Sequence, residues 1–238
     1  MKNLHNLLFI LCLMPLSSFA EGDSTANTVK RNNFGFSLGI GKTYPTFNTD
    51  YDYDVISGTS QCFGFFYERV LNKKISLLSE AQIVNHFRSG FEVHRHDFPV
   101  GQKNDKLNIL MEQHFDYNML FGAKYNFNFF NMPIFAFSTD LYIGLGRTHG
   151  LIYSGSRSFD FLHYESNVSS GSVNYALLKL NLSKRINLGK RLFISPIITG
   201  NFMLHTIKSP KIEVWDGYKF KDAPFRYNSF LYGLQIGF

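Results

Sequence analysis

The sequence predicts an all-β protein, an eight-stranded antiparallel up-and-down transmembrane β-barrel with short periplasmic turns and long extracellular loops. Three observations support this prediction: a cleavable export signal, segments in which every second residue is apolar, and short turns that alternate with long polar segments. The chain has 238 residues, of which 45% are hydrophobic and 17% aromatic. This length and composition fit one all-β domain.

The end of the chain carries the clearest strand pattern. Its large apolar residues alternate with Ser, Gly and Gln; they are Phe230, Tyr232, Leu234, Ile236 and Phe238. A period of two indicates a strand with one apolar face. In water the unpaired edge of such a strand favours aggregation, whereas in a closed membrane barrel it pairs with the first strand. The first predicted strand has the matching pattern, with Phe34, Phe36, Leu38 and Ile40 on one face.

Residues 1–20 read as a signal peptide that is cleaved after Ala20, because Lys2 precedes a short apolar run and a small-residue site. Cleavage removes Cys12 and leaves Cys62 alone, so the mature chain has no internal disulfide. It also removes Lys2, which lowers the formal net charge from +6 to +5. Residues 21–32 are expected to form a polar periplasmic tail, and 33–238 the barrel domain.

The alternating segments predict eight strands, at 34–41, 61–70, 75–87, 109–127, 133–146, 175–185, 192–204 and 229–238. Short turns are expected at Leu71–Lys74, Asn128–Met132 and Asn187–Arg191. Long outer loops are expected at 42–60, 88–107, 147–172 and 205–226, the last forming a tall hairpin. Pro196 lacks the N–H that a paired strand uses, which predicts a bulge there. A barrel of ten strands is the alternative if an outer loop joins the sheet.

The faces of the predicted strands that lie opposite the apolar faces favour a barrel in a membrane over a barrel in water. They carry Gly, Ser and Asn with few charges, and large aromatics lie near the strand ends, at Tyr67, Tyr125, Phe127 and Phe238. That position is typical of the aromatic girdle at a membrane interface. We therefore expect an outer-membrane location, with anionic lipopolysaccharide and outer-membrane lipids as neighbours of a basic chain. The alternative is a soluble lipocalin-like barrel.

The chain resembles the small outer-membrane β-barrel proteins, close in plan to the PorT-like outer membrane protein β-barrel domain family. The resemblance rests on the signal peptide, the Gly-alternating first strand, the Leu77–Ala81 segment and the terminal alternation. It implies the fold, while members of such families differ in function. It also implies that a C-terminal signal directs the chain to the outer-membrane barrel assembly machinery, through Tyr232, Leu234, Ile236 and Phe238.

Charged residues on the predicted inner faces form two groups, which differ in their height above the periplasmic turns. Asp140 and Lys179 should be level, with Glu80 a little lower, while a second group lies nearer the periplasm and comprises Glu68, Lys124 and Arg185. Side chains fill the interior of an eight-stranded barrel, and buried charges must be matched. We therefore expect a structural charge network that plugs the lumen. A gated ion path is the alternative.

Two loop segments offer weaker chemistry. His94, His96 and Asp97, with His86 nearby, carry metal-binding donors, but their spacing is not that of known zinc sites. The segment His163–Asn167 is faintly similar to the His and Ser of a lipid A deacylase, yet Glu165 intervenes and the segment lies in a predicted loop. We therefore expect no catalytic, metal or cofactor-binding residue.

The sequence contains no nucleotide or nucleic-acid motif. The expected function is that of a non-enzymatic outer-membrane barrel, which presents extracellular loops to an unidentified ligand or supports the envelope. A narrow channel or transporter for small solutes is the first alternative, and a lipid A-modifying hydrolase the second.

Overall fold

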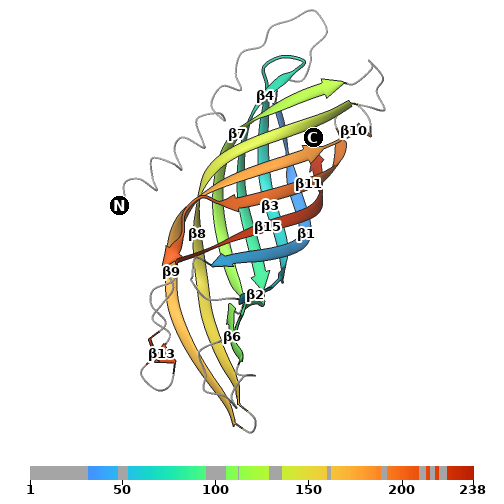
Figure 1. Cartoon of the computed structure of the whole chain (residues 1–238). Coiled ribbons are helices and arrows are strands. Elements are labelled where there is room, and N and C mark those ends of the chain that lie inside the picture. Colours follow the sequence, from blue (N-terminus) through green and yellow to red (C-terminus); the bar gives the residue numbers. More distant parts are fainter. Residues whose placement is uncertain are drawn as a thin grey trace, which may run out of the picture.

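The computed structural model forms a closed barrel of eight antiparallel strands (Figure 1). It describes residues 32–47, 53–94, 106–111, 113–128, 136–159, 162–188, 192–208, 213–214, 218–219 and 224–238. The barrel strands are β1 (Asn32–Phe47), β3 (Gly58–Val70), β4 (Ile75–Phe87), β7 (His114–Asn128), β8 (Ala136–Phe159), β9 (Leu162–Ser183), β11 (Phe193–Met203) and β15 (Pro224–Gly237). The expected signal peptide and the tail up to residue 31 lie outside the described residues.

The barrel closes between its first and last strands, as the matching patterns predict. β1 and β15 pair from Gly35 opposite Gly237 to Phe47 opposite Phe225. Beyond β15, the Phe238 N–H donates to the Phe34 carbonyl at 2.8 Å, and the Phe34 N–H donates to the Phe238 carbonyl at 3.1 Å. The apolar C-terminal strand therefore has no free edge.

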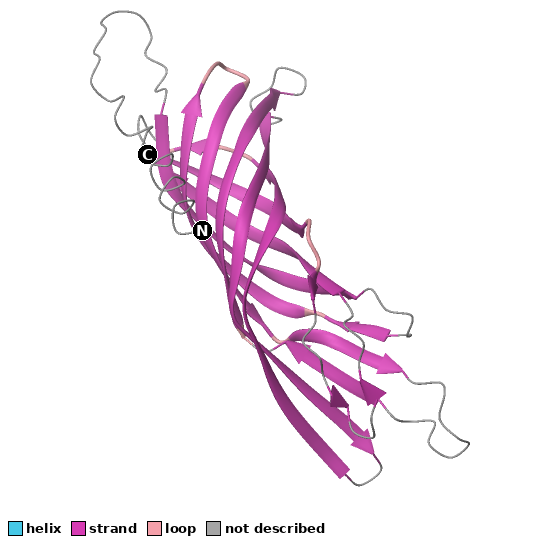
Figure 2. Ribbon diagram, turned by 90° about the vertical axis from the view of Figure 1, so that its left-hand side faces the viewer, coloured by secondary structure: helices cyan, strands magenta, loops and turns pink. Residues whose placement is uncertain are grey.

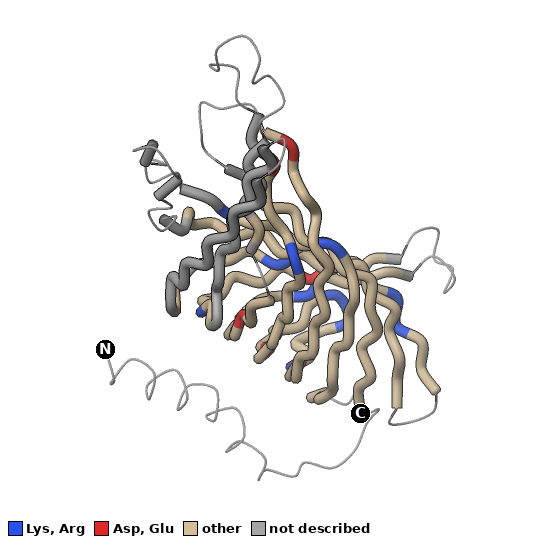
Figure 3. The backbone as a smooth tube through the Cα atoms, turned by 90° about the horizontal axis from the view of Figure 1, so that it is seen from below, with Lys and Arg blue, Asp and Glu red and all other residues tan. Residues whose placement is uncertain are grey.

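Within the barrel wall, each strand turns an apolar face outward and a polar face into the lumen. Ile40, Ile143 and Tyr232 are 61%, 60% and 68% exposed, and the inner faces bury Ser, Thr, Asn, Gln and charged side chains. Lys, Arg, Asp and Glu occupy only short stretches of the described backbone (Figure 3). Among the described residues, no helix has the length and hydropathy needed to cross a membrane.

One end of the barrel, here called the turn end, carries the short connections and the C-terminus (Figure 1). The turn Leu71–Lys74 is confirmed: the Asn72 side-chain oxygen accepts from the N–H groups of Lys74 and Ile75, both at 2.8 Å. Near the connection between β9 and β11, β10 (Ile186–Asn187) pairs with the start of β11. Residues 129–135 and 189–191 lie outside the description.

The other end, the hairpin end, contains strands where loops were predicted. β8 and β9 stay paired out to Phe159 opposite Leu162, so the prediction of a loop at 147–172 is wrong (Figures 1 and 2). A register shift after Thr148 marks the irregularity within this long hairpin. Its Ser- and Gly-rich sequence lacks an apolar face, yet main-chain hydrogen bonds hold the two strands together.

Two other predicted loops are also partly strand. β2 (Tyr53–Ile56), β5 (Ser89–His94) and β6 (Lys106–Met111) join β8 in the order β8-β6-β5-β2. The predicted strand 109–127 is therefore two elements, because β6 pairs in this outer sheet and β7 in the barrel wall. None of the three enters the closed ring, which keeps eight strands.

The predicted hairpin at 205–226 is described in part. β12 (Ile207–Lys208) pairs with the first residues of β15, and β13 (Glu213–Val214) pairs with β14 (Tyr218–Lys219). Residues 215–217, between β13 and β14, lie outside the described residues.

Pro196 is accommodated without the predicted bulge. The β11–β15 register continues through Pro196 opposite Leu234, while pairing with β9 begins one residue later, at Ile197. The Pro196 carbonyl accepts from the Lys184 N–H at 3.2 Å. The proline thus lies at the end of the β9 ladder, where its missing N–H removes no ladder bond.

Candidate functional site in the barrel interior

The centre of the lumen holds an ion pair that links opposite walls. The Lys179 ammonium on β9 donates to a Glu80 carboxylate oxygen on β4 at 2.7 Å and to the Gln82 side-chain oxygen at 3.0 Å. The Ser37 hydroxyl donates to the other Glu80 oxygen at 2.8 Å. Lys179 is 1% exposed and its Nζ lies 5.3 Å from the centroid of the buried Tyr142 ring. Hydrogen bonds and aromatic contact thus replace the solvent that both charges lose.

A second charge cluster lies nearer the turn end, around Glu68. Its carboxylate lies 3.3 Å from Lys124 Nζ and 3.6 Å from a guanidinium nitrogen of Arg185. The Asn33 amide donates to the same carboxylate at 2.9 Å. Arg185 also stacks on the Phe193 ring, with 3.7 Å between its guanidinium carbon and the ring centroid. One buried acid is therefore matched by two bases.

Asp140 lies in the lumen wall beside these clusters. The sequence groups it with Lys179, but the β7–β8 register places it opposite Lys124. It accepts a hydrogen bond from Asn181 at 3.2 Å, and Asn181 in turn accepts from Thr199 at 2.8 Å. Asp140 takes part in none of the ion pairs found among the described side chains.

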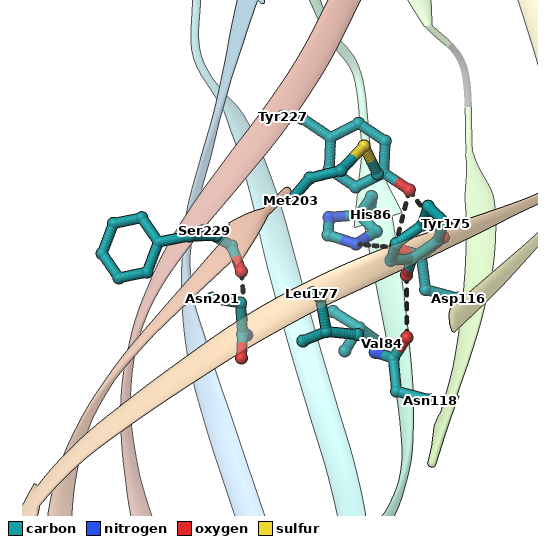
Figure 4. A pocket seen from close by; sticks show the side chains of 11 residues that line it. Val84, His86, Asp116, Asn118, Tyr175, Leu177, Asn201, Met203, Tyr227 and Ser229 are labelled. Carbon is teal, nitrogen blue, oxygen red and sulfur yellow. Dashed lines mark hydrogen bonds and ion pairs between the residues drawn. The ribbon is translucent and has the colours of Figure 1, made fainter. Parts of the chain in front are cut away.

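A third polar cluster fills the hairpin end of the lumen, and the sequence did not predict it (Figure 4). His86 Nε2 lies 3.1 Å from an oxygen of Asp116. The Tyr227 hydroxyl lies 2.7 and 2.8 Å from the two Asp116 oxygens, and the Thr148 hydroxyl donates to Asp116 at 2.8 Å. The His114 ring stacks on His86 with centroids 4.7 Å apart. β4, β7, β8 and β15 each contribute a side chain.

The other imidazole nitrogen of His86 contacts two hydroxyls. Its Nδ1 lies 2.7 Å from the Thr43 oxygen and 3.1 Å from the Ser60 oxygen, and these two hydroxyls contact each other. The order hydroxyl–imidazole–carboxylate is the one that activates a nucleophile. However, both hydroxyl residues are fully buried, and the adjoining cavity of about 20 Å³ has room for about one water. The cavity beside His86 is therefore too small for a substrate.

Strand periodicity gives part of the signal for this cluster, and strand register gives the rest. His86 shares the inward face of β4 with Glu80, and His114 and Asp116 share that of β7, where His114 is registered opposite His86. In the sequence, His86 lies closer to the loop residues His94, His96 and Asp97. His94 ends β5, while His96 and Asp97 lie outside the described residues.

The segment His163–Asn167, compared with a lipid A deacylase, lies in β9 rather than in a loop. Only its backbone is described, and it pairs with β8 between Ser154 and Ser158.

No model of a known protein family matches the chain, and neither does any curated protein. Solved structures that align with it include Ail, the attachment invasion locus protein of Yersinia pestis, at 12% identity and a TM-score of 0.40, over 87% of this chain and 99% of that one. Neisserial surface protein A aligns at 9% identity and a TM-score of 0.38, over 86% and 95% of the two chains. The outer membrane protease OmpT of Escherichia coli aligns at 9% identity and a TM-score of 0.40, over 91% and 99%.

Proposed function

We propose that this protein is a non-enzymatic outer-membrane barrel that anchors an outer β-extension and presents it for binding at the cell surface. The observation that carries the proposal is that the barrel combines a filled polar interior with an exposed apolar belt on its outer surface. Ile40, Ile143 and Tyr232 belong to this belt. Apolar patches of this extent are rare on soluble monomers. A lipid bilayer covers such a belt, and barrel closure satisfies the main-chain groups within it.

The filled interior favours an anchor over the alternative of a channel. Buried ion pairs and the large buried side chains of Phe66, Leu120 and Tyr142 occupy the lumen between the two ends. Eight-stranded barrels are narrow enough for side chains to fill them. Solute passage would require Lys179 and Glu80 to separate, which would leave two unmatched buried charges.

The outer extension supports the binding role. The long β8–β9 hairpin and the strands β2, β5 and β6 project from the hairpin end of the rigid barrel (Figure 2). Recognition sites are commonly built on extensions and loops that a rigid scaffold positions. Lipopolysaccharide and outer-membrane lipids would surround the belt, and the barrel assembly machinery would recognise the terminal strand.

The test begins with the full chain refolded in detergent. We expect a gel band that runs faster before boiling than after it, and no stepwise conductance in planar bilayers. Discrete conductance steps would contradict the anchor role and support a channel. A changed lipid A mass in cells that express the chain would instead support the hydrolase alternative.

The binding role is tested on cells that display the protein. A variant in which residues 151–169 are replaced by a two-residue Asn-Gly turn should keep its gel shift, because the barrel pairs without that segment. We expect it to lose adhesion to a panel of glycans and extracellular-matrix proteins that the wild type binds. Equal adhesion by both forms, or none by either, would contradict presentation by this hairpin.

A further inference from the structure

The geometry points to a binding site for one divalent transition-metal ion, with Zn²⁺ as the best match, formed by His86, His114 and Asp116 inside the hairpin end of the barrel. One ligand atom from each residue lies within 4.8 Å of the other two, and all three side chains are buried. Imidazole nitrogen with carboxylate oxygen is a donor set that zinc and its first-row neighbours bind.

The distances require only small side-chain movements. Metal–ligand bonds of about 2.1 Å in a tetrahedral site place neighbouring donor atoms about 3.4 Å apart. His86 Nε2 and Asp116 Oδ2 are already 3.1 Å apart. Strand register places His114 opposite His86, and the two imidazole rings stack with an interplanar angle of 18°. A rotation of the His114 ring would complete three ligands.

The charge of Asp116 gives a reason for a cation here. Glu68 and Glu80 pair with Lys or Arg, whereas Asp116 pairs with the imidazole of His86. Asp116 is 2% exposed, and a buried carboxylate is stabilised by a matching positive charge. A divalent ion would supply that charge and would also bind imidazole nitrogen.

The surroundings support ligation through His86 Nε2. Its Nδ1 lies within hydrogen-bond distance of Thr43 and Ser60, and metal-bound histidines commonly donate their second N–H to such a partner. Thr148 and Tyr227 hold the Asp116 carboxylate in place. The cavity of about 20 Å³ beside His86 and Asp116 has room for one water, which would serve as a fourth ligand.

The test uses the full chain refolded in metal-free detergent buffer and titrated with Co²⁺, followed by competition with Zn²⁺. We expect one equivalent of Co²⁺ to give visible absorption bands of low-symmetry coordination, and Zn²⁺ to abolish them. His114→Phe keeps a stacked ring but removes a ligand, so binding should weaken at least tenfold. His149→Phe, which removes an exposed histidine of β8, should bind as the wild type does.

Folding of each variant is checked by the gel shift before titration. If His114→Phe fails that check, Asp116→Asn replaces it, because it keeps the shape of the side chain while removing the charge. Absence of Co²⁺ bands in the wild type would overturn the proposal. Equal binding by the folded ligand variant, or equal loss in His149→Phe, would also overturn it, since the ion would then be held elsewhere.

Discussion

Lys179 and Glu80 are 99 positions apart in the sequence and lie on strands that are not neighbours, yet their charged atoms meet at 2.7 Å across the lumen. β7 and β8 separate β4 from β9 around the wall, so this ion pair ties two distant parts of the barrel together. Because both side chains are buried, each depends on the other for its countercharge.

Lys179→Met should destabilise the barrel by about 3–5 kcal/mol, because Glu80 would become a buried charge without a partner. Urea unfolding, followed by the loss of the fast gel band, measures this change. Adding Glu80→Gln should recover part of the loss, since it removes the stranded charge. Lys42→Met, at an exposed position on β1, is the control and should change stability by less than about 0.5 kcal/mol. Equal effects at positions 42 and 179 would contradict the countercharge role.

Ile143→Arg should reveal whether the apolar belt faces lipid. Ile143 is 60% exposed, so arginine would fit sterically, but a charge near the middle of a bilayer costs about 2–4 kcal/mol. Thr59→Arg, at an exposed position toward the hairpin end, should cost about 1 kcal/mol or less. Unfolding is measured in lipid vesicles. A negligible cost at Ile143 would indicate that this face meets water.

Gly35→Ala and Gly39→Ala form a matched pair on β1. A methyl group at Gly35 would collide with the Ile236 carbonyl oxygen and lie 2.6 Å from the Phe66 ring, whereas its nearest neighbour at Gly39 would be 3.5 Å away. We expect about 1–3 kcal/mol of destabilisation at Gly35 from overpacking, and little change at Gly39. Comparable unfolding midpoints for the two variants would show that the closing seam can adjust.

Phe238→Ala should separate assembly in cells from folding in detergent. The main-chain bonds between Phe238 and Phe34 close the seam without the aromatic side chain. The variant should therefore refold in detergent but reach the outer membrane of cells at a reduced level, because the proposed assembly signal is incomplete. Fractionation measures the level, with Phe230→Ala on the same strand as control. Wild-type levels would contradict a role for the terminal aromatic residue.

The sequence predicted the barrel well because eight strands each separate apolar from polar residues with a period of two. The outer extension was missed for the opposite reason: at 147–172 neither face is apolar, and only main-chain pairing reveals a strand. The His86 cluster also escaped prediction. Its members lie on β4, β7, β8 and β15, and strand register, which sequence periodicity alone does not give, brings them together.

Tyr227→Phe should test how the buried Asp116 carboxylate is stabilised. The substitution keeps the ring, which packs 5.1 Å from His86 and 5.3 Å from His114, and removes only the hydroxyl that donates to Asp116. A hydrogen bond to a charged group contributes about 1.5–3 kcal/mol, so unfolding should become easier by that amount in metal-free buffer. Tyr232→Phe is the control, because that side chain is 68% exposed. Equal effects in the two variants would exclude a special role for the Tyr227 hydroxyl. If Zn²⁺ binds at Asp116, saturating Zn²⁺ should raise the stability of Tyr227→Phe, because a bound cation also compensates the carboxylate that lost its donor.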